Sequence, residues 1–312
     1  MKKILKRIAI ALTVLLVLGT AGLAIAVKVR ENRTFDAPYP DIHASTDPAV
    51  IERGRYLAHG PAHCVDCHAE PGQPATEQPH LSGGTAFHLP VGTFYVANIT
   101  PDPVTGIGRY SDQEIARTLR YGVHPSGRAM LPFMPFAELA DDDLTAVISY
   151  LRSRPPMQHE VPAHDVTLLG RLVKAFILEP TGPKHPVPAT VEKGATVAYG
   201  KYLANNVANC VGCHTKRSKR TGAPIGELFA GGMEVESHID GSTFVTPNLT
   251  PDPTSGHIYA WSEEQFLARF RHAVATPSPM PWRSFSTMSD DDLRALYRYL
   301  RSLPPINTRE GA

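Results

Sequence analysis

The sequence predicts an all-α protein in which one N-terminal transmembrane helix precedes two tandem copies of a small helical domain. Three observations support this prediction: an uncharged apolar run at 8–27, motifs that recur within the chain, and apolar residues spaced three and four apart after helix-start signals. We expect a membrane anchor at 1–30, the first domain at 31–156, a linker with a short helix at 157–190, and the second domain at 191–312.

The composition is that of a globular chain without a strong charge bias. Hydrophobic residues make up 42% of the chain and charged residues 20%, which excludes a largely disordered protein. The net charge of +1 does not provide the basic surface that nucleic-acid binding needs, so we expect no nucleic-acid partner.

The N-terminal segment predicts export of the rest of the chain. The run IAIALTVLLVLGTAGLAIAV at 8–27 follows four basic residues, and about 20 apolar residues are needed to span a bilayer. The preceding positive charge favours an N-terminus on the inner side. A secretory signal usually has a shorter apolar region of about 7–15 residues. Because Ala24-Ile25-Ala26 imitates a cleavage site, a cleaved signal is the alternative to an anchor.

The repeated motifs predict two copies of one domain. They recur at offsets within 146–151 residues. In order, they are Gly-x-Tyr-Leu-Ala at 54–58 and 200–204, Cys-x-x-Cys-His at 64–68 and 210–214, Asn-x-Thr-Pro-Asp-Pro at 98–103 and 248–253, Met-Pro-aromatic at 134–136 and 280–282, and the segment DDDLTAVISYLRSRPP at 141–156, which returns as DDDLRALYRYLRSLPP at 290–305.

Each copy is predicted to contain three helices joined by long loops. The first helix leads into Cys-x-x-Cys-His, over 48–60 and 194–206. The second follows Ser111 or Ser262, which are good N-caps with acidic residues behind them. The third starts at the Asp triplet and stops at Pro-Pro, because proline cannot continue a helix. A flat apolar cofactor would give the Gly/Pro loops a surface to pack on.

The linker at 157–190 is proline-rich but contains the segment VTLLGRLVKAFIL at 166–178. Its apolar residues Leu169, Leu172, Val173, Phe176 and Ile177 fall on one helical face. We expect this helix to pack against the two domains, with contact to a partner or a membrane as the alternative.

The two Cys-x-x-Cys-His motifs use all four cysteines of the chain and carry the attachment signature of c-type haem. Two intervening residues set the thiols at the spacing of the two haem vinyl groups, and the following histidine then reaches the iron. The signature predicts two covalently bound haem c groups: Cys64, Cys67 and His68 for the first, and Cys210, Cys213 and His214 for the second.

Other uses of these cysteines fit the pattern less well. A zinc site usually draws its ligands from nearby segments, a thioredoxin-like pair needs a βαβ pattern, and a disulfide framework does not require the adjacent histidines. The same five-residue pattern at equivalent places in a repeat favours haem.

Methionine is the usual second axial ligand in electron-carrying cytochromes, where it raises the reduction potential. Met280 lies in a proline-rich loop and is the better candidate in the second copy, because Met288 is placed like a core residue. In the first copy Met134 shares the Met-Pro-aromatic motif with Met280. An offset of 150 residues instead aligns Met280 with Met130, so Met130 remains the alternative.

The order of these motifs resembles the cytochrome c subunits of bacterial membrane-bound alcohol and gluconate dehydrogenases and related dihaem cytochromes. The resemblance covers about 50–156 and 194–305 and implies tandem cytochrome c-like domains with the ligand pairs His68–Met134 and His214–Met280. Subunits of this family carry three haem domains, whereas this chain has two. The resemblance also implies the inner membrane as the location, with the haem domains on the periplasmic side, or secretion into the periplasm if the signal is cleaved.

The resemblance implies electron transfer from a dehydrogenase subunit or other donor towards quinone, a soluble cytochrome or a terminal oxidase. Membrane lipid would contact the N-terminal helix. The alternative is a dihaem redox enzyme of the peroxidase or thiosulfate dehydrogenase type, which needs one haem with an open distal position. The matched Met-Pro-aromatic motifs favour an electron carrier that catalyses no reaction itself.

Overall fold

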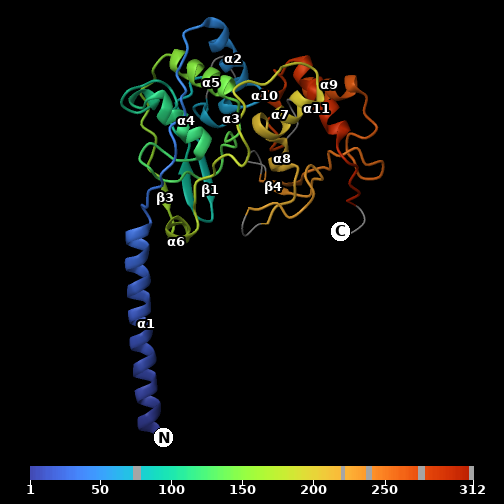
Figure 1. Cartoon of the computed structure of the whole chain (residues 1–312). Coiled ribbons are helices and arrows are strands. Elements are labelled where there is room, and N and C mark those ends of the chain that lie inside the picture. The colour runs from blue at the N-terminus through green and yellow to red at the C-terminus, as the bar shows by residue number, and fades with distance from the viewer. Residues whose placement is uncertain (73–78, 219–221, 237–240, 273–277, 309–312) are drawn as a thin grey trace.

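The structure is a computed structural model that describes residues 1–72, 79–218, 222–236, 241–272 and 278–308; the end of the expected second domain, 309–312, lies outside them. A long N-terminal helix, α1 (Lys2–Arg30), projects away from two helical units that lie side by side (Figure 1). The length and composition of α1 suit a helix that crosses a membrane, and they suit a signal sequence equally well.

The same order of elements recurs in the two units. Domain 1 contains α2 (Pro48–His59), α3 (Cys64–His68), β1 (Ala86–Leu89), β2 (Gly92–Tyr95), η1 (Ile107–Arg109), α4 (Asp112–Tyr121) and α5 (Asp141–Ser153). Domain 2 contains α7 (Val197–Tyr202), the π-helix η2 (Leu203–Val207), α8 (Cys210–Cys213), β4 (Glu234–Glu236), β5 (Thr243–Val245), α9 (Glu263–His272), α10 (Trp282–Phe285) and α11 (Asp290–Ser302).

The predicted helices are confirmed to within a few residues, and their ends have local causes. Ser111 and Glu114 form a reciprocal capping box at the start of α4, and the Ser262 hydroxyl accepts the backbone N–H of Gln265 at 3.3 Å at the start of α9. Both helices that begin at an Asp triplet end before the Pro-Pro pair. The helix that leads into Cys-x-x-Cys-His in domain 2 differs from its counterpart α2, because α7 continues into the π-helix η2.

In each domain the first and last helices cross at a glycine. A Cβ atom on Gly54 would lie 1.8 Å from the carbonyl oxygen of Ala146, and one on Gly200 would lie 1.9 Å from that of Ala295. Only glycine allows α2 to approach α5, and α7 to approach α11, this closely. The repeated Gly-x-Tyr-Leu-Ala motif is therefore a helix-crossing motif.

The expectation of an all-α chain is correct for most of the regular structure and wrong for five short strands. β1 pairs antiparallel with β2, and β4 pairs antiparallel with β5. β3 (Asp165–Val166), from the linker, adds to β2. β1 and β4 each follow a glycine pair, Gly83-Gly84 and Gly231-Gly232. All five strands have two to four residues, which is too short for a periodicity to show in the sequence.

The linker helix α6 (Leu168–Phe176) is confirmed, but its predicted apolar face is not buried against the two domains. Leu169 and Ile177 are exposed, whereas the small residues Gly170 and Ala175 make the buried contacts. Figure 1 shows α6 beside the domain end of α1.

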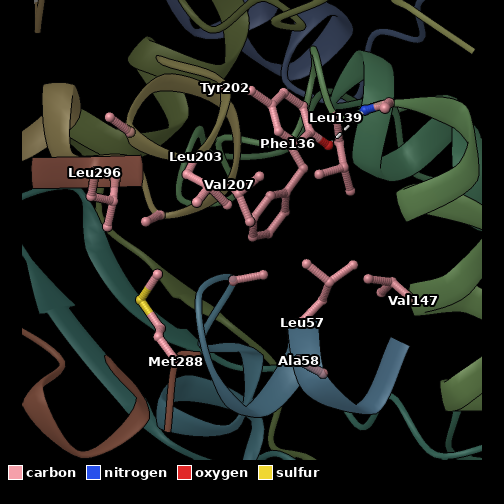
Figure 2. Packing of buried hydrophobic residues seen from close by; sticks show 14 of the residues in the cluster. Leu57, Ala58, Phe136, Leu139, Val147, Tyr202, Leu203, Val207, Met288 and Leu296 are labelled. Carbon is pink, nitrogen blue, oxygen red and sulfur yellow. Dashed lines mark hydrogen bonds between the residues drawn. The ribbon is translucent and has the colours of Figure 1, made fainter. Parts of the chain in front are cut away.

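One continuous hydrophobic core joins the two domains. Figure 2 shows Phe136 and Leu139 of domain 1 close to Tyr202, Leu203 and Val207 of domain 2. Leu203 and Val207 have no exposed surface, and Leu139 is 2% exposed. The shared core fixes the two domains against each other.

Candidate functional site

Both Cys-x-x-Cys-His motifs lie on short helical turns, α3 and α8, which follow a residue with left-handed backbone. The residue before the first cysteine is His63 in domain 1, with φ of 41°, and Asn209 in domain 2, with φ of 51°. Asparagine tolerates this conformation well, whereas histidine adopts it less often. Because the two residue types differ, the sequence predicts no shared role for them, yet both adopt the same left-handed backbone directly before the motif.

The thiols of the two motifs are free, and Cys64 and Cys210 pack against the hydrophobic core. Burial raises the pKa of Cys64 to about 12 and that of Cys210 to about 12. Both are therefore protonated near neutral pH. Among the described residues there is no group of three or more His, Cys, Asp and Glu side chains placed to hold a metal ion.

Each motif histidine is oriented by a backbone carbonyl. His68 Nδ1 lies 2.9 Å from the carbonyl oxygen of Ala97, and His214 Nδ1 lies 2.9 Å from that of Pro247. Because a carbonyl can only accept, Nδ1 carries the proton and Nε2 keeps its lone pair. Burial also lowers the pKa of both imidazoles, which keeps them neutral. A neutral imidazole with a free Nε2 is the form that ligates iron.

A repeated Gly-Gly turn holds the motif against the loop that provides these carbonyls. The N–H of Gly83 donates to the carbonyl of His68 at 3.0 Å, and the N–H of Gly231 donates to that of His214 at 2.8 Å. Both glycines have left-handed backbone, and a Cβ on Gly83 would lie 2.4 Å from the carbonyl oxygen of Val96. The turn therefore requires glycine at this position in both domains.

The Asn-x-Thr-Pro-Asp-Pro loops are held by their own hydrogen bonds. The side-chain oxygen of Asn98 accepts from Thr100 N and Oγ1, at 2.9 and 2.7 Å, and its amide donates to the carbonyl of Met157 at 2.8 Å. Asn248 makes the same contacts with Thr250 and the carbonyl of Ile306. Both asparagines thus shape a turn, and the adjacent carbonyl orients the histidine.

The two candidate methionine ligands occupy similar environments. Met134 and Met280 are both half-buried and pack against the shared core. Met130 is also half-buried, and its N–H donates to the carbonyl of Gly122 at 2.8 Å. Met288 is 1% exposed, as expected for a core residue.

The indole of Trp282, two residues after Met280, bears on whether the site fits a haem. The Trp282 N–H is buried and has no hydrogen-bond partner among the described residues. Leaving such a donor unpaired is costly, and a haem carboxylate would satisfy it. The neutral histidine, the soft thioether of Met280 and this unpaired donor together fit a haem.

Two arginines, the buried Arg120 and the half-buried Arg271, fix the loop that follows each candidate methionine, and neither is predicted from the motifs. Arg120, from α4, donates to the carbonyl of Leu139 at 2.9 Å and pairs with Asp141. Arg271, at the equivalent place in α9, donates to the carbonyl of Met288 at 2.6 Å and pairs with Asp290. The signal was available, because these arginines and their acidic partners recur within the repeat.

Two tyrosines cross the domain boundary in a pseudo-twofold arrangement. The Tyr56 hydroxyl donates to Asp292 at 2.7 Å and accepts from the N–H of Ser289 at 2.9 Å. The equivalent Tyr202 hydroxyl donates to Asp143 at 2.9 Å and accepts from the N–H of Ala140 at 3.1 Å. Each domain therefore caps the last helix of the other.

The boundary also brings the motif helix of domain 1 against the segment that follows Met280. The ring of His63 packs edge-on against Phe285 of α10, with centroids 5.4 Å apart. On the other side, the amide of Asn206, four residues before Cys210, donates to the carbonyl of Glu138 at 3.2 Å. Each candidate haem site thus adjoins elements of the other domain.

Paired helical domains, each presenting a Cys-x-x-Cys-His turn and an oriented neutral histidine, define a c-type cytochrome. The chain belongs to the family described as cytochrome C oxidase, cbb3-type, subunit III, which matches it over residues 49–151 and 195–300. It is an electron-transfer cytochrome, and the family implies haem c as its cofactor.

Two of the matching relatives are named as cytochrome c subunits of dehydrogenases. The cytochrome c subunit of the quinone-dependent alcohol dehydrogenase of Gluconobacter oxydans (strain 621H) is 32% identical over 288 residues, which cover 83% of this chain and 56% of that subunit. The cytochrome c subunit of gluconate 2-dehydrogenase from Pantoea cypripedii is 30% identical over 286 residues, covering 82% and 60%. The chain thus spans just over half the length of these subunits.

A protein named as a dihaem cytochrome c-type matches over nearly its whole length. This protein of Cereibacter sphaeroides is 26% identical over 304 residues, which cover 95% of this chain and 97% of the relative.

Proposed function

We propose that the protein is a membrane-anchored dihaem cytochrome c that relays electrons between a donor and an acceptor. Each motif would hold one haem by two thioether bonds, with histidine and methionine as axial ligands. The assignment is Cys64, Cys67, His68 and Met134 for domain 1, and Cys210, Cys213, His214 and Met280 for domain 2.

The observation that carries this proposal is the matched construction of the two sites. In both, a backbone carbonyl 2.9 Å from Nδ1 leaves Nε2 of the motif histidine free for iron, and a half-buried methionine packs on the core. When bound, haem supplies one-electron chemistry between ferric and ferrous iron. Two strong axial ligands leave no open position for a substrate, which favours electron transfer over an enzymatic reaction.

The residues at the domain boundary support a relay inside the molecule. The boundary joins the motif turn of domain 1 to the segment after Met280, and its core is continuous. Buried packing of this kind excludes water and holds the two sites at a fixed separation. The protein part of the function is to orient, bury and space the two cofactors.

The donor we propose is a dehydrogenase subunit, by analogy with the relatives named above. Quinone, a soluble cytochrome or a terminal oxidase would accept the electrons. We place α1 across the inner membrane as an uncleaved anchor, with the two domains on the periplasmic side; its uncharged apolar run is long enough to span a bilayer.

The test is the optical spectrum of the reduced protein with and without carbon monoxide, normalised to haem per chain. We expect two haems per chain and no spectral change, because both irons are closed. A change equivalent to one haem would contradict the carrier assignment and point to an open, enzymatic site.

Single variants test the ligand assignment. Met134→Ala and Met280→Ala should each lower the reduction potential of one haem, because the thioether that favours ferrous iron is lost. The vacated position should then bind carbon monoxide. Met130→Ala is the matched control and should do neither. A larger effect of Met130→Ala than of Met134→Ala would show that the ligand of domain 1 is Met130.

A further inference from the structure

The linker helix α6 presents an apolar surface that neither haem domain covers. Thr167 caps its start by accepting the N–H of Gly170. The surface consists of Leu168, 73% exposed, Leu169, 52% exposed, Phe176, 44% exposed, and Ile177, 70% exposed. Four large apolar side chains on one nine-residue helix and its C-cap form an unusual surface for a helix in water.

The opposite side of α6 is fixed to the domain end of α1. Val27 is 8% exposed, the lowest exposure in α1, and Ala175 of α6 has no exposed surface. Arg30 Nε donates to the carbonyl of Ala175 at 3.2 Å, and Arg33 Nη2 donates to that of Leu178 at 2.5 Å. The position of α6 along α1 is therefore set by direct contacts.

These contacts determine the level of α6 relative to a membrane that α1 would span. At 1.5 Å per residue the apolar run 8–27 is about 30 Å long, which is the thickness of the hydrocarbon core. Arg30 lies three residues beyond that run, or about 4.5 Å further along the helix. The interfacial layer on each side of the core is about 5–8 Å thick, so the end of α6 lies within it.

Direct contacts also fix α6 to domain 1. The N–H of Thr167 donates to the carbonyl of Val91 at 3.2 Å, and a Cβ on Gly170 would lie 2.0 Å from the same carbonyl oxygen. β3, just before α6, pairs with β2. The helix thus connects the anchor rigidly to the first haem domain.

The charges around α6 suit a lipid surface. Segments 28–33 and 168–179 contain five basic residues and two acidic ones, namely Lys28, Arg30, Arg33, Arg171 and Lys174 against Glu31 and Glu179. A basic border around exposed apolar side chains is the pattern of a helix that lies in the membrane interface.

We propose that α6 lies in the outer surface of the bilayer, with its exposed apolar side chains inserted among the lipids. It would fix the height and orientation of domain 1 above the membrane. This inference rests on the proposed anchoring by α1.

The experiment uses the full-length holoprotein in nanodiscs of phosphatidylethanolamine and phosphatidylglycerol. A small fraction of the lipid carries a diazirine near the top of its acyl chain, and the photoproducts are located by peptide mass spectrometry. We expect lipid adducts in α1 and in 168–178. The double variant Leu169→Ser/Ile177→Ser should lose at least three-quarters of the α6 adducts and keep those of α1.

Val104→Ser is the matched control, because Val104 is an equally exposed apolar residue, at 63%, in a loop of domain 1. It should leave the α6 adducts unchanged, and the haem absorption of every variant reports correct folding. Adducts in α1 without any in α6 would overturn this inference alone. The absence of adducts in α1 would overturn the anchoring as well.

Discussion

The two buried carboxylates at the domain boundary have different partners, so neutralising them should have different costs. Asp143 accepts two hydrogen bonds from Arg53, at 2.8 and 2.9 Å, and the side chains are 1% and 17% exposed. Each carboxylate also accepts from a tyrosine hydroxyl, Asp143 from Tyr202 and Asp292, which is 6% exposed, from Tyr56, so the Arg53 hydrogen bonds are what distinguish Asp143. Burial raises the pKa of Asp292, whereas hydrogen bonding to Tyr56 opposes that rise.

Asp143→Asn leaves the Arg53 guanidinium without its counter-charge in a largely buried site. Removing one partner of a buried ion pair costs about 3–5 kcal/mol of unfolding free energy. Asp292→Asn keeps an oxygen that can accept from Tyr56 and removes a charge that burial disfavours, so we expect a change within about 1 kcal/mol. The predicted difference is at least about 2 kcal/mol, or roughly thirtyfold in the unfolding equilibrium.

Guanidinium unfolding of the detergent-solubilised holoprotein measures both costs, with haem absorption and far-ultraviolet circular dichroism as independent signals. The same unfolding measurement, repeated across pH, provides a second test. The folded state retains the Asp292 proton to higher pH than the unfolded chain, so wild-type stability should fall as pH rises from about 4 towards the raised pKa. Asp292→Asn should remove that decrease. Equal costs for the two substitutions would refute the reasoning.

Two further predictions concern the surroundings of the first motif. Gly83→Ala places a Cβ 2.4 Å from the carbonyl oxygen of Val96, so it should cost about 1–3 kcal/mol and lower the haem content per chain. Gly72→Ala, also at left-handed backbone but with open space around it, is the control, and an equal effect would show that backbone strain alone is responsible. Burial lowers the pKa of His59 to about 4, so the protein should lose stability as pH falls from about 6.5 to about 4. Thermal unfolding of His59→Gln should show a weaker pH dependence over that range, and an unchanged slope would contradict this origin; His43→Gln, at an exposed site, is the control.

The helices could be predicted from the sequence because their causes are local. Ser111 accepts from a residue three positions away, and the Pro-Pro pairs stop α5 and α11 at once. The Cys-x-x-Cys-His motifs were equally clear, since their chemistry is contained in five residues. The repeat drew attention to the loops that begin at Asn98 and Asn248, but the contacts with the histidines are made by the carbonyls of the preceding residues, Ala97 and Pro247.

The remaining features depend on partners that are distant in the sequence. Tyr56 bonds with Asp292, 236 positions away, and no local pattern indicates such a partner. The apolar face of α6 was predicted correctly as a face but wrongly as a buried one, because periodicity does not reveal which surface covers it. The strands β4 and β5 are too short to show an alternation.

The domain boundary indicates why the two copies work as a pair. Tyr56 and Tyr202 occupy equivalent positions, yet each satisfies a carboxylate and a helix N-terminus of the other domain. A domain cut out alone would expose its tyrosine to water and leave the carboxylate in the other half without its donor. Arg53, which is replaced by Tyr199 at the equivalent position of domain 2, donates across the boundary to the Tyr199 hydroxyl at 3.1 Å. The two copies have therefore diverged into complementary halves, and folding itself fixes the spacing on which the proposed internal electron relay would depend.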